Sequence, residues 1–201
     1  MRKMLVALSA FAVMMAVSAV AQDMGPKQPF SAEYFYTMNG QPMDGMPLIR
    51  VAATAQTMAV DFGEHGAIIE LRPGSALVTM VMHSSKTYTT SSLPYDSEDL
   101  EAYFFMIAPA GGHEEACAEN GVRCEKLGVE EVAGRPVEHW KIDLPGEGEG
   151  ETWIDVEIGI VVKNTSAEGY GLECRNLSTE KPAASLFKIP EGYSKEGGEE
   201  W

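Results

Sequence analysis

The sequence predicts a mostly β protein of the α+β class: a strongly curved antiparallel sheet, or incomplete barrel, of about ten strands with a covering central helix. Short runs of β-branched and aromatic residues recur along the chain, and each run is closed by a turn cluster. One stretch between residues 96 and 108 has helical spacing instead. A mature chain of roughly 180 residues has the size of one domain, so all the strands are expected in one curved sheet.

The N-terminus has the features of a secretory signal peptide over residues 1–21. Arg2 and Lys3 precede an uncharged apolar run over residues 4–17, and Ala19-Val20-Ala21 offers the small residues of a cleavage site. A membrane anchor is the alternative, but the run is roughly at the lower length limit for spanning a bilayer, and no second apolar segment follows. We therefore expect a periplasmic or secreted protein that does not span the membrane after cleavage. No cysteine follows the site, so no lipid attachment is expected there.

The mature chain reads as a flexible lead (residues 22–28), a single domain (29–195) and a polar tail (196–201). The whole sequence has 15 basic and 30 acidic residues, and loss of Arg2 and Lys3 leaves 13 against 30, a net charge of −17. Such a surface repels nucleic acids and anionic membranes. We interpret the acidity as a source of solubility; an acidic face that docks a basic partner is the alternative.

The first half of the chain predicts a series of strands. Phe30, Tyr34 and Met38 belong to an alternating run that ends at the turn Asn39-Gly40. Glycine, proline and small residues separate the later runs. The predicted strands cover residues 30–38, 47–54, 57–62, 67–72, 76–82 and 86–91.

The strand over residues 76–82 is apolar on both faces. Leu77 and Val81 share one face, and Val78, Met80 and Met82 share the other. A strand of this kind needs a cover on each side, which is either a packed helix or a lipid-like ligand.

Residues 96–108 predict the covering helix. Asp96 or Ser97 is a suitable N-cap, and acidic residues fill the first turns, where the helix dipole favours them. The apolar residues fall on one stripe, which should lie across a sheet face. They are Leu100, Phe104, Ile107 and Ala108. Residues 110–112 end this helix, and 113–120 form one or two further turns.

The last third of the chain has the clearest strand and turn signals, which are typical of an antiparallel meander. Turn clusters lie at residues 133–136 and 145–148. The predicted strands fall within residues 124–144, 150–164, 169–177 and 185–193.

Three cysteines in an exported protein predict one disulfide and one free thiol, and three pairings are possible. Cys117 with Cys124 is the first choice, because Asn120-Gly121 lets the chain reverse between them. Cys174 then becomes a buried free thiol. Cys124 with Cys174, across neighbouring strands, is the alternative. No Cys-x-x-Cys spacing is present to support redox catalysis.

Several motifs of the last third resemble a family of secreted bacterial proteins built on a domain of unknown function. These motifs are Leu127-Gly128-Val129-Glu130 with Gly134, a Trp-x-Ile-Asp strand, Trp153-Ile154-Asp155, and Phe187-x-x-Pro190-x-Gly192-Tyr193. That family is similar in fold to the periplasmic lipoprotein carriers LolA and LolB. The resemblance implies a LolA-like incomplete barrel with a helix-lined apolar cavity, which in the carriers holds acyl chains. No lipoprotein-binding residue of the carriers finds a matching motif here.

The sequence offers no catalytic or metal-binding constellation, so we expect no enzyme, no metal site and no cofactor. His65, His83, His113 and His139 are dispersed and lack zinc-enzyme spacing. A metal set of His113-Glu114-Glu115 with Cys117 is possible, but a solvated helix end explains these residues better. The methionines Met38, Met43 and Met46 offer soft copper ligands, although packing is the favoured interpretation.

The leading functional hypothesis is a non-enzymatic periplasmic binding or carrier protein for a lipid, acyl chain or similar hydrophobic molecule. Six apolar residues are predicted to line its ligand pocket: Met58, Val78, Met80, Met82, Phe104 and Ile107. Packing of these residues against one another, without a cavity, is the competing interpretation. The alternative function is an envelope protein-protein interaction module that uses its acidic surface or an exposed sheet edge.

Overall fold

The computed structural model describes residues 25–101, 103, 106–107, 113–119, 121–132, 134–144 and 148–196. The predicted signal peptide and residues 197–201 of the predicted polar tail lie outside these ranges. None of the helices in the described ranges combines the length and the apolar character needed to cross a membrane.

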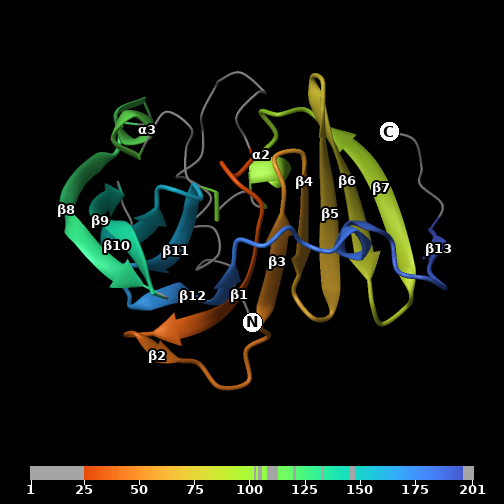
Figure 1. The fold of residues 1–201 in the computed structure, drawn as a ribbon, viewed down its shortest axis with the longest axis horizontal. Helices are drawn as coiled ribbons and strands as arrows, with labels where there is room; N and C mark the ends of the chain where they lie inside the picture. The colour runs from red at the N-terminus through yellow and green to blue at the C-terminus, as the bar shows by residue number, and fades with distance from the viewer. Residues whose placement is uncertain are drawn as a thin grey trace.

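The described residues build one curved sheet of 13 strands (Figure 1). Pairing follows the order β13-β7-β6-β5-β4-β3-β1-β12-β11-β10-β9-β8, and β2 pairs with β1. The order begins at β13 and ends at β8, so the sheet curls without closing, which confirms the predicted mostly β fold. The strands are β1 (Phe30–Met38), β2 (Gln41–Pro42), β3 (Ile49–Ala53), β4 (Thr57–Asp61), β5 (His65–Arg72), β6 (Ser75–Met82), β7 (Thr87–Leu93), β8 (Arg123–Val132), β9 (Arg135–Leu144), β10 (Gly148–Asp155), β11 (Ile160–Thr165), β12 (Tyr170–Ser178) and β13 (Ser194–Lys195). The helical segments are α2 (Glu98–Glu101), α3 (His113–Glu119) and the 3-10 turn η2 (Ala184–Phe187).

The strands of the first half lie within two residues of their predicted bounds, apart from β2, which the sequence analysis did not predict. The turn after β1 is where it was expected, because Asn39 and Gly40 both adopt positive φ angles, 51° and 74°. Two such residues in succession match the twist of an antiparallel hairpin. The residues Asn39 and Gly40 therefore determine where the first strand ends and the chain turns back.

The concave side of the sheet, called the inner face below, holds the main hydrophobic core. On β1, Phe30 and Tyr34 point to this side, and their β3 partners are Ala53 and Ile49. The Tyr34 hydroxyl donates a hydrogen bond to the Val161 carbonyl (2.9 Å), so it ties β1 to β11. The core is continuous from the β3–β6 half of the sheet to the β9–β11 half, with Met58, Val60, Ile69, Val78, Val137, Trp153, Ile158, Ile160 and Val162 among its members.

The prediction of a covering central helix is wrong. Helix α2 has only 4 residues, and α3, with 7 residues, lies against β8. Beyond α2 the chain approaches the sheet: the Val161 N–H donates to the Met106 carbonyl (2.8 Å), and Ile107 forms an antiparallel bridge with Ile160. These two contacts attach residues 106–107 to β11, and Leu100 and Ile107 are both buried in the core.

The predicted strand over residues 185–193 is also wrong, since this part of the chain crosses the sheet instead of extending it. Residues 179–193, called the C-terminal strap below, run over the convex outer face of β3–β5, in blue in Figure 1. The strap contains η2, and Pro190 has no N–H to donate to a strand neighbour. After crossing, the chain arrives parallel to β7, with Ser194 opposite Thr87. Among the described strands, the pairings are therefore antiparallel except for this β13–β7 pair.

Candidate functional site

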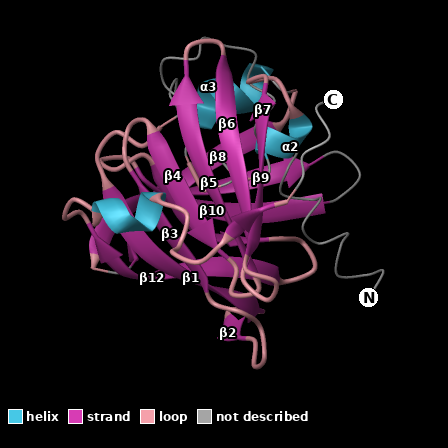
Figure 2. Ribbon diagram, turned by 90° about the vertical axis from the view of Figure 1, so that its right-hand side faces the viewer, coloured by secondary structure: helices cyan, strands magenta, loops and turns pink. Residues whose placement is uncertain are grey.

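A cavity of about 500 Å³ lies between the outer face of β1 and β3–β6 and the C-terminal strap. Figure 2 shows the short helix of the strap on one side of the sheet and α2 on the other. The residues around the cavity come from the sheet, from the end of β12 and from the strap. They are Ser31, Ala32, Glu33, Arg50, Val51, Ala52, Ala59, Val60, Asp61, Gly66, Ala67, Ile68, Val81, His83, Asn176, Ser185, Leu186, Lys188 and Pro190.

Small side chains on the outer face make room for the cavity. Ala52 pairs with Ala59, and Ala59 pairs with Ile68, so these three residues form one row across β3, β4 and β5. Gly66, opposite Val81, lies beside this row, and these five residues are called the cavity floor below. A Cβ added at Gly66 would come within 2.9 Å of the Val60 carbonyl oxygen. Ala52 and Val81 are only 5% and 3% exposed although they point away from the core. The strap therefore converts an outer sheet face into an apolar, covered surface.

Polar groups gather at the rim of this cavity. Arg50 Nε lies 3.6 Å from Glu33 Oε1, and Arg50 Nη1 lies 3.9 Å from Asp61 Oδ2. These separations exceed hydrogen-bond length, so the guanidinium keeps donors that a ligand can use. On the other side, His83 Nε2 is 3.6 Å from Asp61 Oδ1, and His83 Nδ1 is 2.8 Å from the Tyr193 hydroxyl. The contact between His83 and Tyr193 joins the rim of the cavity to the end of the strap.

The six residues predicted to line a pocket lie elsewhere. Met58, Val78 and Ile107 are part of the inner-face core. Met80 packs against this core and accepts a hydrogen bond from the Tyr103 hydroxyl (2.7 Å). Met82 is exposed at the end of β6, and Phe104 falls outside the described residues. Their role in ligand binding stays a prediction.

The outer-face residues were not among those predicted to line a pocket, although the sequence contains a signal for them. Ala52 and Ala59 stand next to Val51 and Val60, so β3 and β4 each carry a small apolar residue on the outer face as well as apolar residues on the inner face. This is the same two-faced pattern that drew attention to residues 76–82. The cover for these outer faces is the strap, which comes from a distant part of the chain.

The Cys117–Cys124 disulfide is present, which confirms the first-choice pairing, and Cys174 is the buried free cysteine. The chain reverses at Gly121, which has φ of 66°, and the Val122 N–H donates to the Cys117 carbonyl (2.8 Å). A residue in this left-handed conformation is typical of the end of a helix, and glycine adopts it without steric cost. The disulfide thus fastens the end of α3 to the start of β8.

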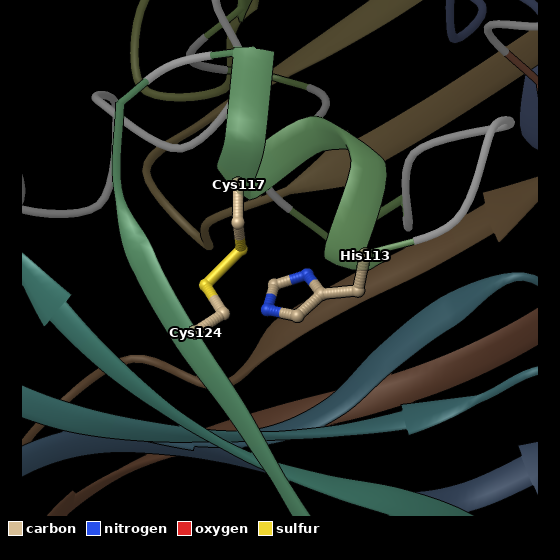
Figure 3. Close-up of side chains that lie close together, drawn as sticks. All are labelled: His113, Cys117 and Cys124. Atoms are coloured by element: carbon tan, nitrogen blue, oxygen red, sulfur yellow. A yellow bond between two sulfur atoms is a disulfide. The ribbon is translucent and has the colours of Figure 1, made fainter.

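His113 lies beside this disulfide, with its imidazole turned toward the two sulfur atoms (Figure 3). Its ring packs edge-on against Trp140, with 5.2 Å between ring centroids. The Nε2 atom is buried and has no hydrogen-bond partner among the described residues. Burial lowers the pKa of His113 to about 4, against the opposing effect of Glu138, so the imidazole is neutral at pH 7.

His139 has a structural role, because both of its ring nitrogens are engaged. Nδ1 lies 2.8 Å from Glu130 Oε1, and Nε2 lies 3.0 Å from Glu151 Oε2. The ring stacks on Trp153 at 4.2 Å, and Trp153 Nε1 donates to Glu130 Oε2 (2.9 Å). The bonds from Trp153 and then His139 lower the pKa of Glu130. This cluster joins β8, β9 and β10 and leaves no nitrogen for a metal or substrate.

The buried Cys174 thiol is expected to resist alkylation while the protein is folded. Burial raises its pKa from 9.0 to about 12. At pH 8 the reactive thiolate is therefore about a thousandfold rarer than in the unfolded chain. The folded state holds this proton more tightly, so its stability falls as the pH rises from about 9 toward 12. Iodoacetamide labelling followed by mass spectrometry should show modification of Cys174 in urea but little without it; equal rates would contradict the burial of this thiol.

No protein-family model and no curated protein matches the sequence. Solved structures do match the fold. An uncharacterized conserved protein from Thermus thermophilus is similar over 94% of this chain and 96% of its own, with a TM-score of 0.52 and 11% identity. PNGF-II is similar over 84% of this chain, with a TM-score of 0.51 and 10% identity, but this chain spans only 31% of its length.

One further solved structure matches at a lower TM-score. A candidate outer membrane lipoprotein-sorting domain from Vibrio parahaemolyticus matches over 83% of this chain and 92% of its own, with a TM-score of 0.32 and 11% identity. At 10% and 11% identity, what this chain shares with PNGF-II and with the Thermus thermophilus protein is the fold.

Proposed function

We propose that this protein is a non-enzymatic, periplasmic binding or carrier protein for an acyl chain, lipid or similar hydrophobic molecule, which it holds beneath the C-terminal strap. The observation that supports the proposal is the covered apolar floor on the outer face of β3–β6. Its volume of about 500 Å³ falls in the range of roughly 300–1,000 Å³ that is typical of small-molecule pockets.

The floor suits the apolar part of a ligand. Alanine and glycine expose a smooth surface with few polar atoms, and Ile68 and Val81 add branched contacts. Each methylene buried there contributes about 0.8 kcal/mol before the cost of ordering the chain. A chain of about ten methylenes therefore contributes roughly 8 kcal/mol before the costs of ordering and association.

The rim suits a polar head group. Arg50 and Lys188 face Glu33 and Asp61 around the same cavity, so positive and negative groups are balanced. Arg50 makes only loose ion pairs within the protein and retains donors for a ligand oxygen. The combination of apolar floor and polar rim favours an amphipathic molecule over a purely apolar one.

The test fills the cavity with a bulky side chain and measures fatty-acid binding. Ala59 lies in the middle of the floor, and Ala59→Trp is expected to weaken binding of the fluorescent fatty acid cis-parinaric acid at least tenfold, by about 1.4 kcal/mol or more. The matched control is Thr57→Trp, on the same strand and the same face but outside the cavity lining, which should leave binding unchanged. Fluorescence titration gives the affinities, and circular dichroism confirms that both variants fold.

Other outcomes separate the competing interpretations. Equal binding by the parent and Ala59→Trp would remove the outer-face cavity as the site. Loss of binding in Met82→Arg instead would favour the inner-face pocket predicted from the sequence. Absence of binding by the parent, together with an organic extract that contains no lipid, would contradict the carrier function.

An interaction module remains the second candidate, supported by the exposed edge of β8. This strand ends the sheet among the described residues, and its outward side chains Leu127 and Val129 are 46% and 67% exposed. A strand edge of ten residues is a template for an extended peptide of a partner. A parent protein that binds no fatty acid in the titration would favour this function.

A further inference from the structure

We propose that Cys117, Cys124 and His113 form a binding site for a thiophilic divalent cation, with Zn²⁺ as the type case, once the disulfide is reduced. The three ligand atoms already lie within 4.8 Å of one another. Around one tetrahedral zinc ion, with Zn–S of about 2.3 Å, two sulfur ligands lie roughly 3.8 Å apart. A cation therefore fits between these side chains once the reduced sulfur atoms move apart to this distance.

The local fold holds the three residues in position. His113 and Cys117 are four residues apart on α3, so they share one face of the helix. Cys124 stands near the start of β8, and the Gly121 turn brings it back to that face. Two backbone hydrogen bonds, from Gly121 to Ala118 and from Val122 to Cys117, hold this return independently of the sulfur atoms.

The unpartnered nitrogen of His113 is the second observation that supports the site. Buried polar atoms in folded proteins are nearly always hydrogen-bonded. Nε2 of His113 is buried without such a partner among the described residues, and Figure 3 shows the ring pointing at the sulfurs. A metal–nitrogen bond would satisfy this atom. While the disulfide is intact the sulfurs offer no thiolate, so the oxidised protein lacks the ligand set.

The chemistry balances with a dithiol as reductant. The dithiol gives two electrons and two protons to the Cys117–Cys124 bond, which breaks into two thiols, and the dithiol becomes a disulfide itself. The cation then displaces the two thiol protons, which pass to solvent, and forms two metal–sulfur bonds. His113 donates its nitrogen lone pair as the third ligand, and water takes the fourth position. Redox state thereby controls whether the protein holds a cation.

A cobalt titration of the reduced protein tests the proposal. The protein is reduced with dithiothreitol, desalted without oxygen and titrated with Co²⁺, whose thiolate complexes have a sulfur-to-cobalt charge-transfer band. We expect one equivalent of Co²⁺ to bind, and Zn²⁺ to abolish the band. The Cys174→Ser variant should behave identically, because that thiol is buried away from the site.

Matched variants decide the role of each ligand. His113→Ala should weaken Co²⁺ binding at least tenfold, because the site loses one of its three protein ligands, and loss even of a residue that only supports a ligand costs about that much at other metal sites. Cys117→Ser should abolish the charge-transfer band of a two-thiolate site. The oxidised parent should show no band, because its sulfurs are held in the disulfide and offer no thiolate to Co²⁺. Absence of the band from the reduced parent, whether or not α3 stays folded, or an unchanged affinity in His113→Ala, would overturn the proposal.

Discussion

Val78→Arg is expected to unfold the protein or to lower its free energy of unfolding by several kcal/mol. Val78 is 2% exposed and pairs with Ile69 on the inner face, within the main core. Burying a charged group without a partner costs several kcal/mol even after the protein relaxes. A domain of this size has a total stability of only about 5–15 kcal/mol. Urea unfolding followed by circular dichroism should therefore show a lost or strongly shifted transition.

Met82→Arg is the matched control for this prediction. Met82 lies on the same strand and the same face as Val78, four residues further along, but it is 40% exposed. Its arginine reaches water, so a cost below about 1 kcal/mol is expected. A Val78→Arg variant with parental stability would contradict a packed core at this point. It would favour the alternative in which the inner face holds a hydrated ligand pocket.

Asp155→Ala is expected to destabilise the protein by about 3 kcal/mol, because this carboxylate is buried and fully used. Asp155 is 0% exposed, and its Oδ2 pairs with the Arg135 guanidinium. Its Oδ1 accepts the backbone N–H groups of Glu157 (3.0 Å) and Ile158 (3.1 Å), which shape the β10–β11 turn. The variant leaves the buried N–H of Ile158 without its carboxylate partner, and it leaves the half-buried Arg135 paired with Glu157 alone. Arg135 is partly exposed and regains some water, so we place the effect at the low end of the range for broken buried pairs.

The other carboxylate that pairs with Arg135 provides the comparison. Glu157 Oε2 lies 2.9 Å from Arg135 Nη2, but its side chain is 65% exposed. Ion pairs of this kind contribute about 0.2–1 kcal/mol, so Glu157→Ala should change stability by less than about 1 kcal/mol. Thermal or urea unfolding measures both variants. Equal losses of stability in the two variants would mean that the burial of Asp155 does not determine how much it contributes to stability.

The sequence by itself determined most of the strand positions and the turn at Asn39-Gly40, and it favoured the Cys117–Cys124 pairing over the alternatives. These features depend on residues close together in the chain. Period-two alternation places side chains on one face of a strand, and turn residues set where the strand ends. The two cysteines are only 7 residues apart, and a glycine between them adopts the required φ angle. Such local preferences are visible without knowledge of the fold.

Only the tertiary structure decided what covers the two faces of the sheet. Residues 106–107 pair with the backbone of β11, more than fifty residues later in the chain, instead of continuing the predicted helix. The strap covers Ala52, Ala59 and Val81 from a part of the chain about a hundred residues away, and His83 meets Tyr193 across a separation of 110. Similarly, the unpaired nitrogen of His113 became apparent only when α3 and β8 were placed together. Long-range contacts of this kind leave no periodic signal in the sequence, because each partner's pattern is explained equally well by simple burial.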